Sequence, residues 1–287
     1  MATAAIPVDL GSGAPSEAPE IWDGLCSALV NYGKLHIFAD FDGTLSDLVD
    51  VPNLATLDPR AEGALRRLHR NPRVSLCIVS GRSVDDVASR IPLPVTFAGD
   101  HGLEIHAPDM EYIVPEAQVL RRLLLELCNR IREQIQDVPG ALMEAKRFTA
   151  SVHYRQVDSK AVPAILDAIR RCLAGTDFDV RSGSCVFEIY PRVDWGKGDA
   201  VSWLLNRQGG VPEQAVCIGD DESDESMFRK HPNSVNVRVI NGNGSPTAAQ
   251  YCIHRSGIAS LLNGIADVAE AITWPCGSRA KVESCSA

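Results

Sequence analysis

The chain has 287 residues, of which 45% are hydrophobic and 23% charged, and its formal net charge is −9 at pH 7. This composition is that of an ordinary globular protein of one or two domains rather than a disordered one. The acidic balance argues against nucleic acid as a partner, and no apolar run approaches the ~20 residues that a membrane span requires.

The N-terminal segment 1–20 is small, polar and rich in proline and glycine, so we expect it to be disordered. It lacks the basic and apolar regions of a secretory signal. The nine cysteines form no C-x-x-C pair, and several lie inside apolar runs, as Cys77 and Cys217 do. A cysteine in such a run acts as a small hydrophobe, so the pattern favours a reducing, cytoplasmic location and argues against zinc.

From residue 21 onward, helical and strand patterns alternate. Apolar spacing and buried apolar runs predict a helix at 21–30, a strand at 35–39, a helix at 59–70, a strand at 74–79, a helix at 84–90 and a strand at 95–98. After a central region the pattern resumes with a helix at 200–205, strands at 216–218, 234–240 and 251–253, and a helix at 257–272. This alternation predicts an α/β fold with a doubly wound, Rossmann-like parallel sheet.

The central region has a different pattern of predicted elements. Strand patterns at 103–106 and 111–114 flank a turn, and they are followed by a helix at 116–137, a strand at 149–154, a helix at 158–173 and strands at 178–181 and 185–190. Hairpin strands with two helices indicate a small α+β domain inserted into the first. The predicted organisation is a core at 21–106 and 192–275, an inserted cap at 107–191 and a loose tail at 276–287.

The strand at 35–39 runs directly into two carboxylates, Asp40 and Asp42. Open α/β sheets bind their ligands at the carboxyl ends of the strands. Two acids fixed there can divide two tasks. Asp40 would attack a phosphorus atom, while Asp42 would protonate the leaving oxygen and later deprotonate a water. On this stretch alone, an ordinary strand-ending turn explains the residues equally well.

A second acidic stretch, with Asp220, Asp221 and Asp224, follows the strand at 216–218. Magnesium prefers hard oxygen ligands. Asp40 and Asp220 could supply carboxylates and Asp42 a carbonyl, with Asp221 and Asp224 holding bound waters or orienting Lys197. A solvated helix start is the plain alternative for this stretch.

Residues that could hold a phosphate group also follow predicted strands. The candidates are Thr44, Ser80, Gly81, Arg82 and Lys197. A hydroxyl beside backbone N–H groups at a helix start can hold phosphate oxygens, and a lysine would link the nucleophile to the phosphate and offset charge in the transition state. A helix N-cap for Ser80 and a surface position for Lys197 are the plain alternatives.

Together these motifs resemble the haloacid dehalogenase-like phosphohydrolase superfamily, with its D-x-D-G-T, Ser/Thr, Lys and G-D-D-x-x-D motifs. A narrower resemblance, to trehalose-6-phosphate phosphatases, is carried by DFDGTL, VSGR, GDHGLEI, EAKRFTASVHYR, VFEIYP, WGKGDA and GDDESDE. It implies a magnesium-dependent phosphatase that releases trehalose from trehalose 6-phosphate through an aspartyl phosphate, with a cap that selects the sugar.

The resemblance also implies contacts with the substrate. The residues that would shape the entrance to the phosphate site or face the sugar are Arg82, His101, Gly102, Glu104, Lys146, His153, Arg155, Arg181, Ser182 and Glu188. Two departures from the family pattern are GDHG, where GSHG or GAHG is commoner, and EIYP, where Tyr190 replaces an arginine.

The expected partner is a small phosphorylated sugar, and the sequence does not indicate an oligomeric state. The motifs leave three alternatives open. The first is a phosphatase of the same architecture for another glycosyl phosphate or a pseudo-disaccharide phosphate. The others are a phosphomutase and a non-catalytic module that binds phosphosugars.

Overall fold

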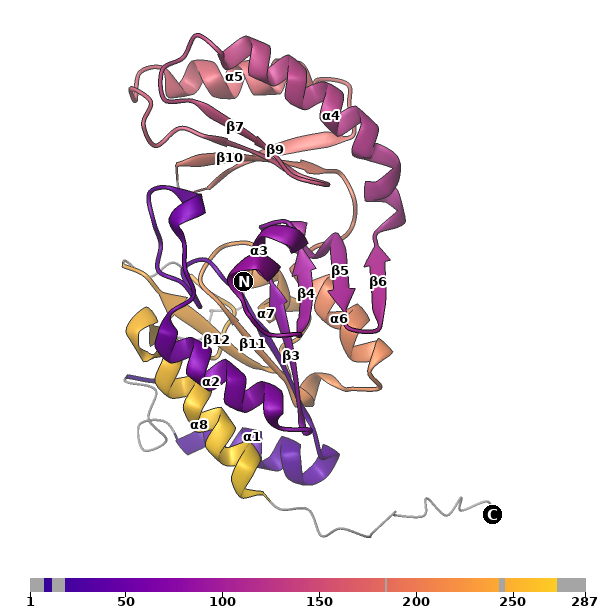
Figure 1. Cartoon of the computed structure of the whole chain (residues 1–287), viewed down its shortest axis with the longest axis vertical. Coiled ribbons are helices and arrows are strands. Elements are labelled where there is room, and N and C mark those ends of the chain that lie inside the picture. Colours follow the sequence, from indigo (N-terminus) through magenta and orange to yellow (C-terminus); the bar gives the residue numbers. More distant parts are fainter. Residues whose placement is uncertain (1–7, 12–18, 184, 243–245, 273–287) are drawn as a thin grey trace.

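The computed structural model describes residues 8–11, 19–183, 185–242 and 246–272 (Figure 1). Two β-sheets lie one above the other, a nine-stranded sheet and a four-stranded sheet. Helices pack on both faces of the larger sheet and on the outer face of the smaller one. The predicted α/β class with a parallel-sheet core is confirmed.

The larger sheet is parallel over most of its width. In spatial order its strands are β1 (Val8–Asp9), β13 (Tyr251–His254), β12 (Val235–Ile240), β11 (Ala215–Gly219), β2 (Leu35–Ala39), β3 (Val74–Val79), β4 (Thr96–Gly99), β5 (Glu104–Ala107) and β6 (Met110–Ile113). Among the strands described, the antiparallel pairings of this sheet are β4 with β5 and β5 with β6. All five residues of β2 are buried, and strands covered on both faces read as apolar runs. The sequence therefore locates β2 and β3 to the residue.

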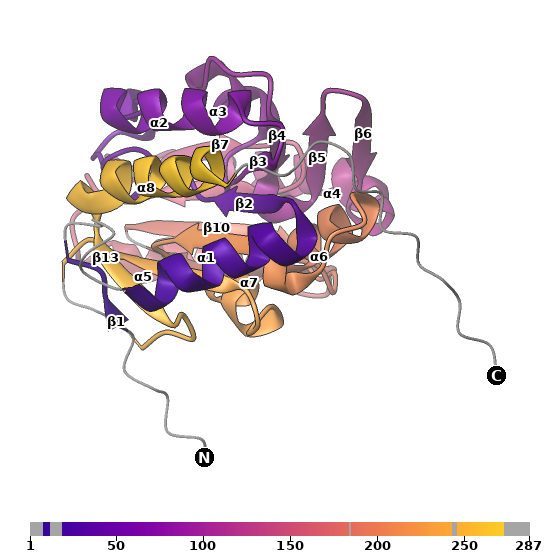
Figure 2. The same cartoon turned by 90° about the horizontal axis from the view of Figure 1, so that it is seen from below.

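Two helical layers sandwich this sheet (Figure 2). One layer contains α1 (Pro19–Tyr32), α2 (Pro59–Arg70), α3 (Val84–Arg90) and α8 (Ile258–Ala271), and the other contains α6 (Lys197–Arg207) and α7 (Glu225–Lys230). Alternate residues of β2 serve the two layers, because Leu35 and Ile37 pack in the first and Phe38 in the second. Short 3-10 turns complete the chain: η1 (Pro52–Leu54), η2 (Asp100–Gly102), η3 (Pro212–Gln214) and η4 (Arg255–Gly257).

The smaller sheet is antiparallel, in the order β7 (Leu142–Ala145), β8 (Ala150–His153), β10 (Val186–Pro191) and β9 (Phe178–Gly183). The helices α4 (Pro115–Ile135) and α5 (Val162–Leu173) cover one face, where Val152 and Phe187 pack. The alternate residues His153 and Glu188 point to the opposite face, toward the larger sheet. The smaller sheet thus presents polar side chains to the larger one. We use "cap" for residues 115–191 and "core" for the rest.

Three elements differ from the sequence predictions. β6, which we had placed in the inserted segment, pairs with β5 in the larger sheet, and Tyr112 on it stacks on Trp203 of α6 at 4.4 Å. β7 was not predicted, because its sequence LMEA has neither an apolar run nor a clear alternation. Within the segment expected to be disordered, β1 pairs with β13.

Residues 1–7 and 12–18 of that segment and the predicted tail at 276–287 lie outside the described residues, while α1 begins within the segment at Pro19. Among the helices that are described, none combines the length and the apolarity needed to cross a bilayer.

Arg255 in η4 holds the chain that leaves β2. Its guanidinium, 9% exposed, donates to the backbone oxygens of Leu45 (3.2 Å) and Ser46 (3.1 Å) and to Oδ2 of Asp58 (3.3 Å). Arg255→Met would remove these three hydrogen bonds from a largely buried position. We expect it to lower the free energy of unfolding by about 2–4 kcal/mol, measured by urea denaturation.

Arg67→Met is the matched control. Arg67 lies on α2 and pairs with two exposed acids of α8, Asp267 at 2.7 Å and Glu270 at 2.8 Å. Exposed pairs contribute little, so this variant should lose less than about 1 kcal/mol. Equal losses in the two variants would contradict the assigned role of Arg255.

Candidate active site

The residues predicted to carry the chemistry meet at the carboxyl edge of the larger sheet. Asp40 follows β2, Ser80 follows β3 and Asp220 follows β11, while Lys197 begins α6. β2 lies between β3 and β11, so the chain reverses its progress across the sheet at this point. Such a switch point is the usual ligand site of an open α/β sheet.

Lys197 connects two parts of this edge. Its Nζ lies 2.7 Å from Oδ1 of Asp40 and 2.7 Å from Oδ1 of Asp224, and all three residues are buried. Burial alone would lower the pKa of Lys197, but the two carboxylates outweigh burial and raise the pKa above its ordinary value. The ammonium group is therefore charged at neutral pH.

The acids around Lys197 outnumber it. Burial, and then the neighbouring carboxylates of Asp224 and Asp220, raise the pKa of Asp40 well above its ordinary value even though Lys197 opposes the shift. Burial and Asp224 likewise raise the pKa of Asp220 to about 7. One carboxylate oxygen from each of the three acids lies within 4.8 Å of the others. All of these donors are oxygens, and their negative charge exceeds the positive charge of Lys197. Such a set of donors fits a hard divalent cation such as Mg²⁺.

Asp224, rather than Asp221, is the third acid of this cluster. Its Oδ1 accepts from Lys197, and its Oδ2 accepts from the backbone N–H groups of Asp220 and Asp221, both at 3.0 Å. A Cβ on Gly219 would overlap the Asp224 carboxyl group, which explains the glycine before the acidic run. Asp224 therefore shapes the loop and orients Lys197, as predicted for a supporting residue, while Asp221 lines the pocket described below.

The sequence analysis missed a residue that fixes Asp220. Nδ2 of Asn241, just after β12, donates to Oδ2 of Asp220 (2.9 Å) and to the carbonyl of Gly43 (2.8 Å). Gly43 has a φ of +73°, and a Cβ there would overlap the Asp220 carboxylate. The loop after β2 and the loop after β11 thus lie too close together for a side chain at position 43. The position of Asn241 after a buried strand was the available signal.

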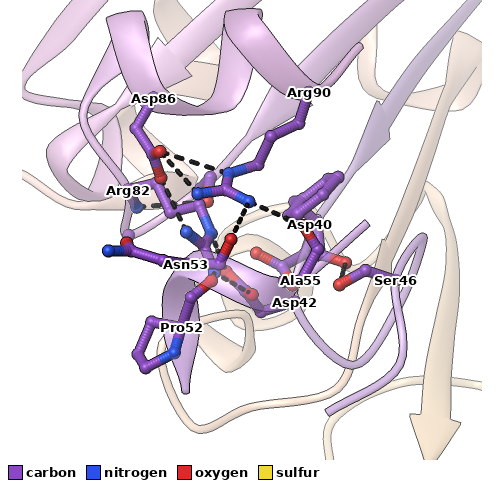
Figure 3. A network of polar contacts seen from close by, with 12 residues as sticks. Asp40, Asp42, Ser46, Pro52, Asn53, Ala55, Arg82, Asp86 and Arg90 are labelled. Atoms are coloured by element: carbon purple, nitrogen blue, oxygen red, sulfur yellow. Dashed lines mark hydrogen bonds and ion pairs between the residues drawn. The ribbon is translucent and has the colours of Figure 1, made fainter. Parts of the chain in front are cut away.

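Asp42, the predicted acid, is held by Arg82 in a two-pronged ion pair (Figure 3). Nε and Nη2 of Arg82 donate to the two carboxylate oxygens of Asp42 at 2.6 and 2.7 Å. Arg82 also donates to Asp86 (2.6 Å) and to the carbonyl of Pro52 (2.9 Å). Arg82 thus engages the predicted acid in this structure, and its contact with phosphate stays a prediction.

The other candidate phosphate ligands occupy three environments. Ser80 is fully buried, and its Oγ accepts a hydrogen bond from the N–H of Arg82 at 3.1 Å. Thr44 is also fully buried, and its hydroxyl has no partner within the described structure. Gly81 borders the pocket. Phosphate contacts by these three residues stay predictions.

A pocket of about 270 Å³ lies between core and cap. The predicted site residues that line it are Asp40, Asp42, Gly81, Arg82, His101, Lys146, His153, Arg155, Glu188, Lys197, Asp220 and Asp221. Residues that the sequence analysis missed also line it, namely Leu48, Val49, Asp50, Pro52, Glu144, Ser151, Gly183, Cys185, Val186 and Ser223. Most of these lie on the loop after β2 or on cap strands, and their side chains reach the pocket only once the cap lies over the core.

Glu188 of β10 lines the cap wall of the pocket next to His101, and Arg181 of β9, which is not among the lining residues, holds Glu188 from behind. Nε of Arg181 donates to Oε2 of Glu188 at 2.8 Å, and Oε1 of Glu188 lies 3.3 Å from Nε2 of His101. Burial alone would raise the pKa of Glu188, but His101 and Arg181 outweigh it and hold the pKa well below the ordinary value. Tyr190 supports this wall, because the guanidinium of Arg181 lies 5.0 Å from its ring centre.

The turn between β7 and β8 attaches the cap to the core. Nζ of Lys146 donates to the carbonyl of Gly81 at 2.8 Å. Asp100 accepts from the N–H of Phe148 (3.2 Å) and from the hydroxyl of Thr149 (2.6 Å). Burial raises the pKa of Asp100 to about 6.

Glu104 joins the same attachment. It is buried, pairs with Arg147 of the turn and lies 2.8 Å from Nε2 of His106, but it does not line the pocket. We predicted that Glu104 would contact substrate, and its position instead fits a role in holding the cap turn.

The remaining predicted substrate ligands divide into two groups. His153 and Arg155 line the pocket, where Nε2 of His153 lies 2.8 Å from Glu144 and Nη1 of Arg155 lies 3.3 Å from Asp50 of the core. Gly102 and Ser182 are not among the lining residues. The carbonyl of Gly102 accepts from the indole N–H of Trp195, and Ser182 is exposed on β9.

The doubly wound sheet and the acids at its switch point define an α/β protein with a site suited to a hard cation. More narrowly, residues 38–253 match the family model described as trehalose-phosphatase, and the chain belongs to that family. The match covers both acidic loops, Lys197 and the whole cap.

Curated relatives carry the same name. The chain is 35% identical over 225 residues to a trehalose-phosphate phosphatase of Mycobacterium tuberculosis, covering 76% of this chain and 57% of the relative. It is 36% identical over 201 residues to one of Mycobacterium leprae, covering 67% of this chain and 46% of the relative. The chain therefore spans about half the length of these relatives.

Solved structures share the fold. A trehalose-6-phosphate phosphatase related protein superposes with a TM-score of 0.72 at 20% identity, covering 81% of this chain and 97% of that one. The C-terminal domain of C. albicans trehalose-6-phosphate phosphatase gives a TM-score of 0.71 at 20% identity, covering 88% of this chain and 97% of that one.

The crowded acids predict a pH-dependent response to Mg²⁺. The pKa of Asp220 is raised from 3.8 to about 7, so the folded protein holds a proton that the unfolded chain has lost, and stability without a cation falls as the pH rises through this window. Mg²⁺ requires deprotonated ligands and should stabilise more at pH 8 than at pH 5. We expect saturating Mg²⁺ to raise the melting temperature by roughly 5–10 °C at pH 8 relative to chelator.

Thermal unfolding at the two pH values measures this response. Asp220→Asn is the control, because it removes one ligand and the shifted acid, and it should abolish most of the response. A response that is equal at both pH values, or absent at pH 8, would contradict the assignment of these acids to a cation.

Proposed function

We propose that this protein hydrolyses trehalose 6-phosphate to trehalose and inorganic phosphate. The observation that carries the proposal is that Asp40, Asp42 and Lys197 line the same pocket as the polar side chains of the cap. Membership of the trehalose-phosphatase family and the names of the curated relatives support this choice of substrate. A phosphosugar that is only bound would not require a second acid beside the nucleophile.

In the first step, a carboxylate oxygen of Asp40 forms a bond to phosphorus while the bond from phosphorus to the sugar oxygen breaks. In this step Asp42 carries a proton on one carboxylate oxygen, which therefore no longer accepts from Arg82 as it does in this structure. Asp42 gives that proton to the sugar oxygen, and trehalose is released as a neutral alcohol. Lys197 keeps Asp40 oriented and offsets the negative charge on the transferring group.

In the second step, Asp42 is the base. It takes a proton from a water whose oxygen attacks phosphorus, and the bond from phosphorus to Asp40 breaks. Inorganic phosphate is released, and both aspartates return to their starting states. The position of Asp42 beside Asp40, at the floor of the pocket, supports both tasks.

We further propose Mg²⁺ as the cofactor. Asp40, Asp220 and the carbonyl of Asp42 would hold it, and Asp221 would lie close enough to hold one of its waters. The ion would supply positive charge next to the phosphoryl oxygens. The raised pKa values of Asp40 and Asp220 support this proposal, because these groups need a further positive neighbour to be fully ionised at neutral pH.

The cap would select the sugar. Glu188 is an ionised acceptor for sugar hydroxyls, and Lys146, His153 and Arg155 offer donors from the same wall of the pocket. The cap would also exclude bulk water while the phosphoryl group is transferred. The reducing, cytoplasmic location expected from the cysteines stays a prediction.

Asp40→Asn should remove turnover, because an amide is not a nucleophile at phosphorus. We expect phosphate release to fall by at least about 10³-fold with the melting temperature little changed. Asp47→Asn is the control, because Asp47 is 83% exposed on the loop that follows the site, and it should retain activity. Appreciable turnover by Asp40→Asn would remove Asp40 from the nucleophilic role.

The substrate is tested with trehalose 6-phosphate, glucose 6-phosphate, other disaccharide phosphates and p-nitrophenyl phosphate, with Mg²⁺ and with chelator. We expect a strong, Mg²⁺-dependent preference for trehalose 6-phosphate. Hydrolysis of p-nitrophenyl phosphate alone would support the proposed phosphatase reaction and contradict the proposed substrate.

Glu188→Gln tests the cap wall. It removes a charged acceptor while keeping the shape of the side chain, so KM for trehalose 6-phosphate should rise by about 10–100-fold. The aryl ester p-nitrophenyl phosphate has no sugar hydroxyl for Glu188 to accept from, so its kinetics should change by less than about threefold. An equal effect on the two substrates would show that Glu188 acts on the core instead.

A further inference from the structure

Asp86, in the first turn of α3, lies outside the pocket and holds two arginines (Figure 3). Its Oδ2 accepts from Nη1 of Arg82 at 2.6 Å, and its Oδ1 accepts from Nη2 of Arg90 at 2.7 Å. Both arginine side chains are largely buried, with 10% and 13% exposed. A carboxylate that is shared between two buried guanidinium groups restricts the orientation of both.

Through Arg82, this restriction reaches Asp42. Two nitrogens of Arg82 grip the two oxygens of Asp42, and a planar fork of this kind fixes the plane of the carboxylate as well as its distance. Asp86 occupies the third nitrogen, Nη1, and so prevents the guanidinium from turning about its own axis. The direction in which Asp42 faces is thus set by a chain of two ion pairs that begins outside the pocket.

Through Arg90, the same carboxylate reaches the loop that forms part of the pocket wall. Nη1 of Arg90 donates to the carbonyls of Asn53 (3.3 Å) and Ala55 (2.6 Å), and Arg82 donates to that of Pro52 (2.9 Å). These carbonyls lie in and beside η1, next to the residues Leu48 to Asp50 that line the pocket. One carboxylate therefore keeps both the predicted acid and the adjacent wall in place.

We infer that Asp86 is a positioning residue for the proton transfer by Asp42, acting through Arg82. The inference rests on one part of the proposed function, namely that Asp42 protonates the leaving oxygen. Asp86 itself touches neither the pocket nor the reacting atoms. A general acid works only when its proton lies in line with the leaving oxygen, so loss of the Asp86 contact reduces the rate without removing the acid.

The chemistry of the leaving group separates this role from a purely structural one. A sugar oxygen is a poor leaving group and needs the proton of Asp42 as its bond to phosphorus breaks. The p-nitrophenolate ion leaves without a proton. A displaced acid therefore slows hydrolysis of the sugar ester but not of the aryl ester, whereas general damage to the site slows hydrolysis of both.

The test compares Asp86→Asn with Asp85→Asn. Both variants convert one acid of the first turn of α3 to its amide, but Asp85 is exposed and its carboxylate has no hydrogen bond or ion pair to any described residue. The quantity measured is kcat/KM, which includes no step after release of the leaving group. Asp86→Asn should lower kcat/KM for trehalose 6-phosphate by about tenfold or more and for p-nitrophenyl phosphate by less than about threefold. Asp85→Asn should change neither.

Arg82→Lys gives a second variant, because it keeps the positive charge and loses the fork. It should show the same selective loss. An equal loss on both esters in Asp86→Asn and Arg82→Lys, or an Asp86→Asn variant that behaves like Asp85→Asn, would overturn the inference.

Asp42→Asn separates this inference from the proposed function. If Asp42→Asn slows both esters equally, Asp42 is not the acid, and the proposed mechanism fails together with the inference. If Asp42→Asn is selective for the sugar ester and Asp86→Asn is not, only the inference fails. If the wild-type protein does not hydrolyse trehalose 6-phosphate, the test uses the alkyl phosphate that the protein hydrolyses best. The test therefore does not depend on the identity of the sugar.

Discussion

The ammonium group of Lys197 lies between the carboxylates of Asp40 and Asp224, and the rest of the site depends on this contact. Each of the three groups is buried, so removing one partner would leave a buried charge uncompensated at a cost of several kcal/mol. The pairing joins the loop after β2, the first residue of α6 and the loop after β11. The sheet edge, the start of a helix and an acidic loop must therefore form together, which keeps the Asp40 carboxylate in one orientation before any ligand is present.

The cap follows from the two-residue period of its strands. Val152 and Phe187 pack beneath the cap helices. The residues next to each of them on its strand must therefore point the other way, toward the core. The residues there are polar, and a polar face cannot be packed as a second apolar core. It instead forms a pocket wall, in which Glu188 finds partners in Arg181 and His101.

Sequence reasoning located the elements whose signal is local. The apolar runs of β2 and β3 and the spacing of α2 and α3 gave their bounds to the residue, and the acids and Lys197 meet because parallel strands end at one edge. The partners of long polar side chains could not be predicted in this way. Arg82 can reach a phosphate or a carboxylate, and only the folded chain shows that Asp42 and Asp86 hold it. Asn241 was missed for the same reason, because one of its partners, Gly43, lies 198 residues earlier and the other, Asp220, is on a separate loop.

The contacts between cap and core are unequal across the pocket. Near the connections to the core, Asp100 and Glu104 hold the cap turn through buried groups. The loop that carries Asp50 lies on the opposite side from the connection between β6 and α4 (Figure 1), and there the cap is held by the ion pair of Asp50 with Arg155, whose side chains are 85% and 40% exposed. An exposed pair contributes little. A rotation of the cap about these connections would separate this edge first, so the sugar of the proposed substrate would enter beside Asp50, away from the buried contacts of Asp100 and Glu104.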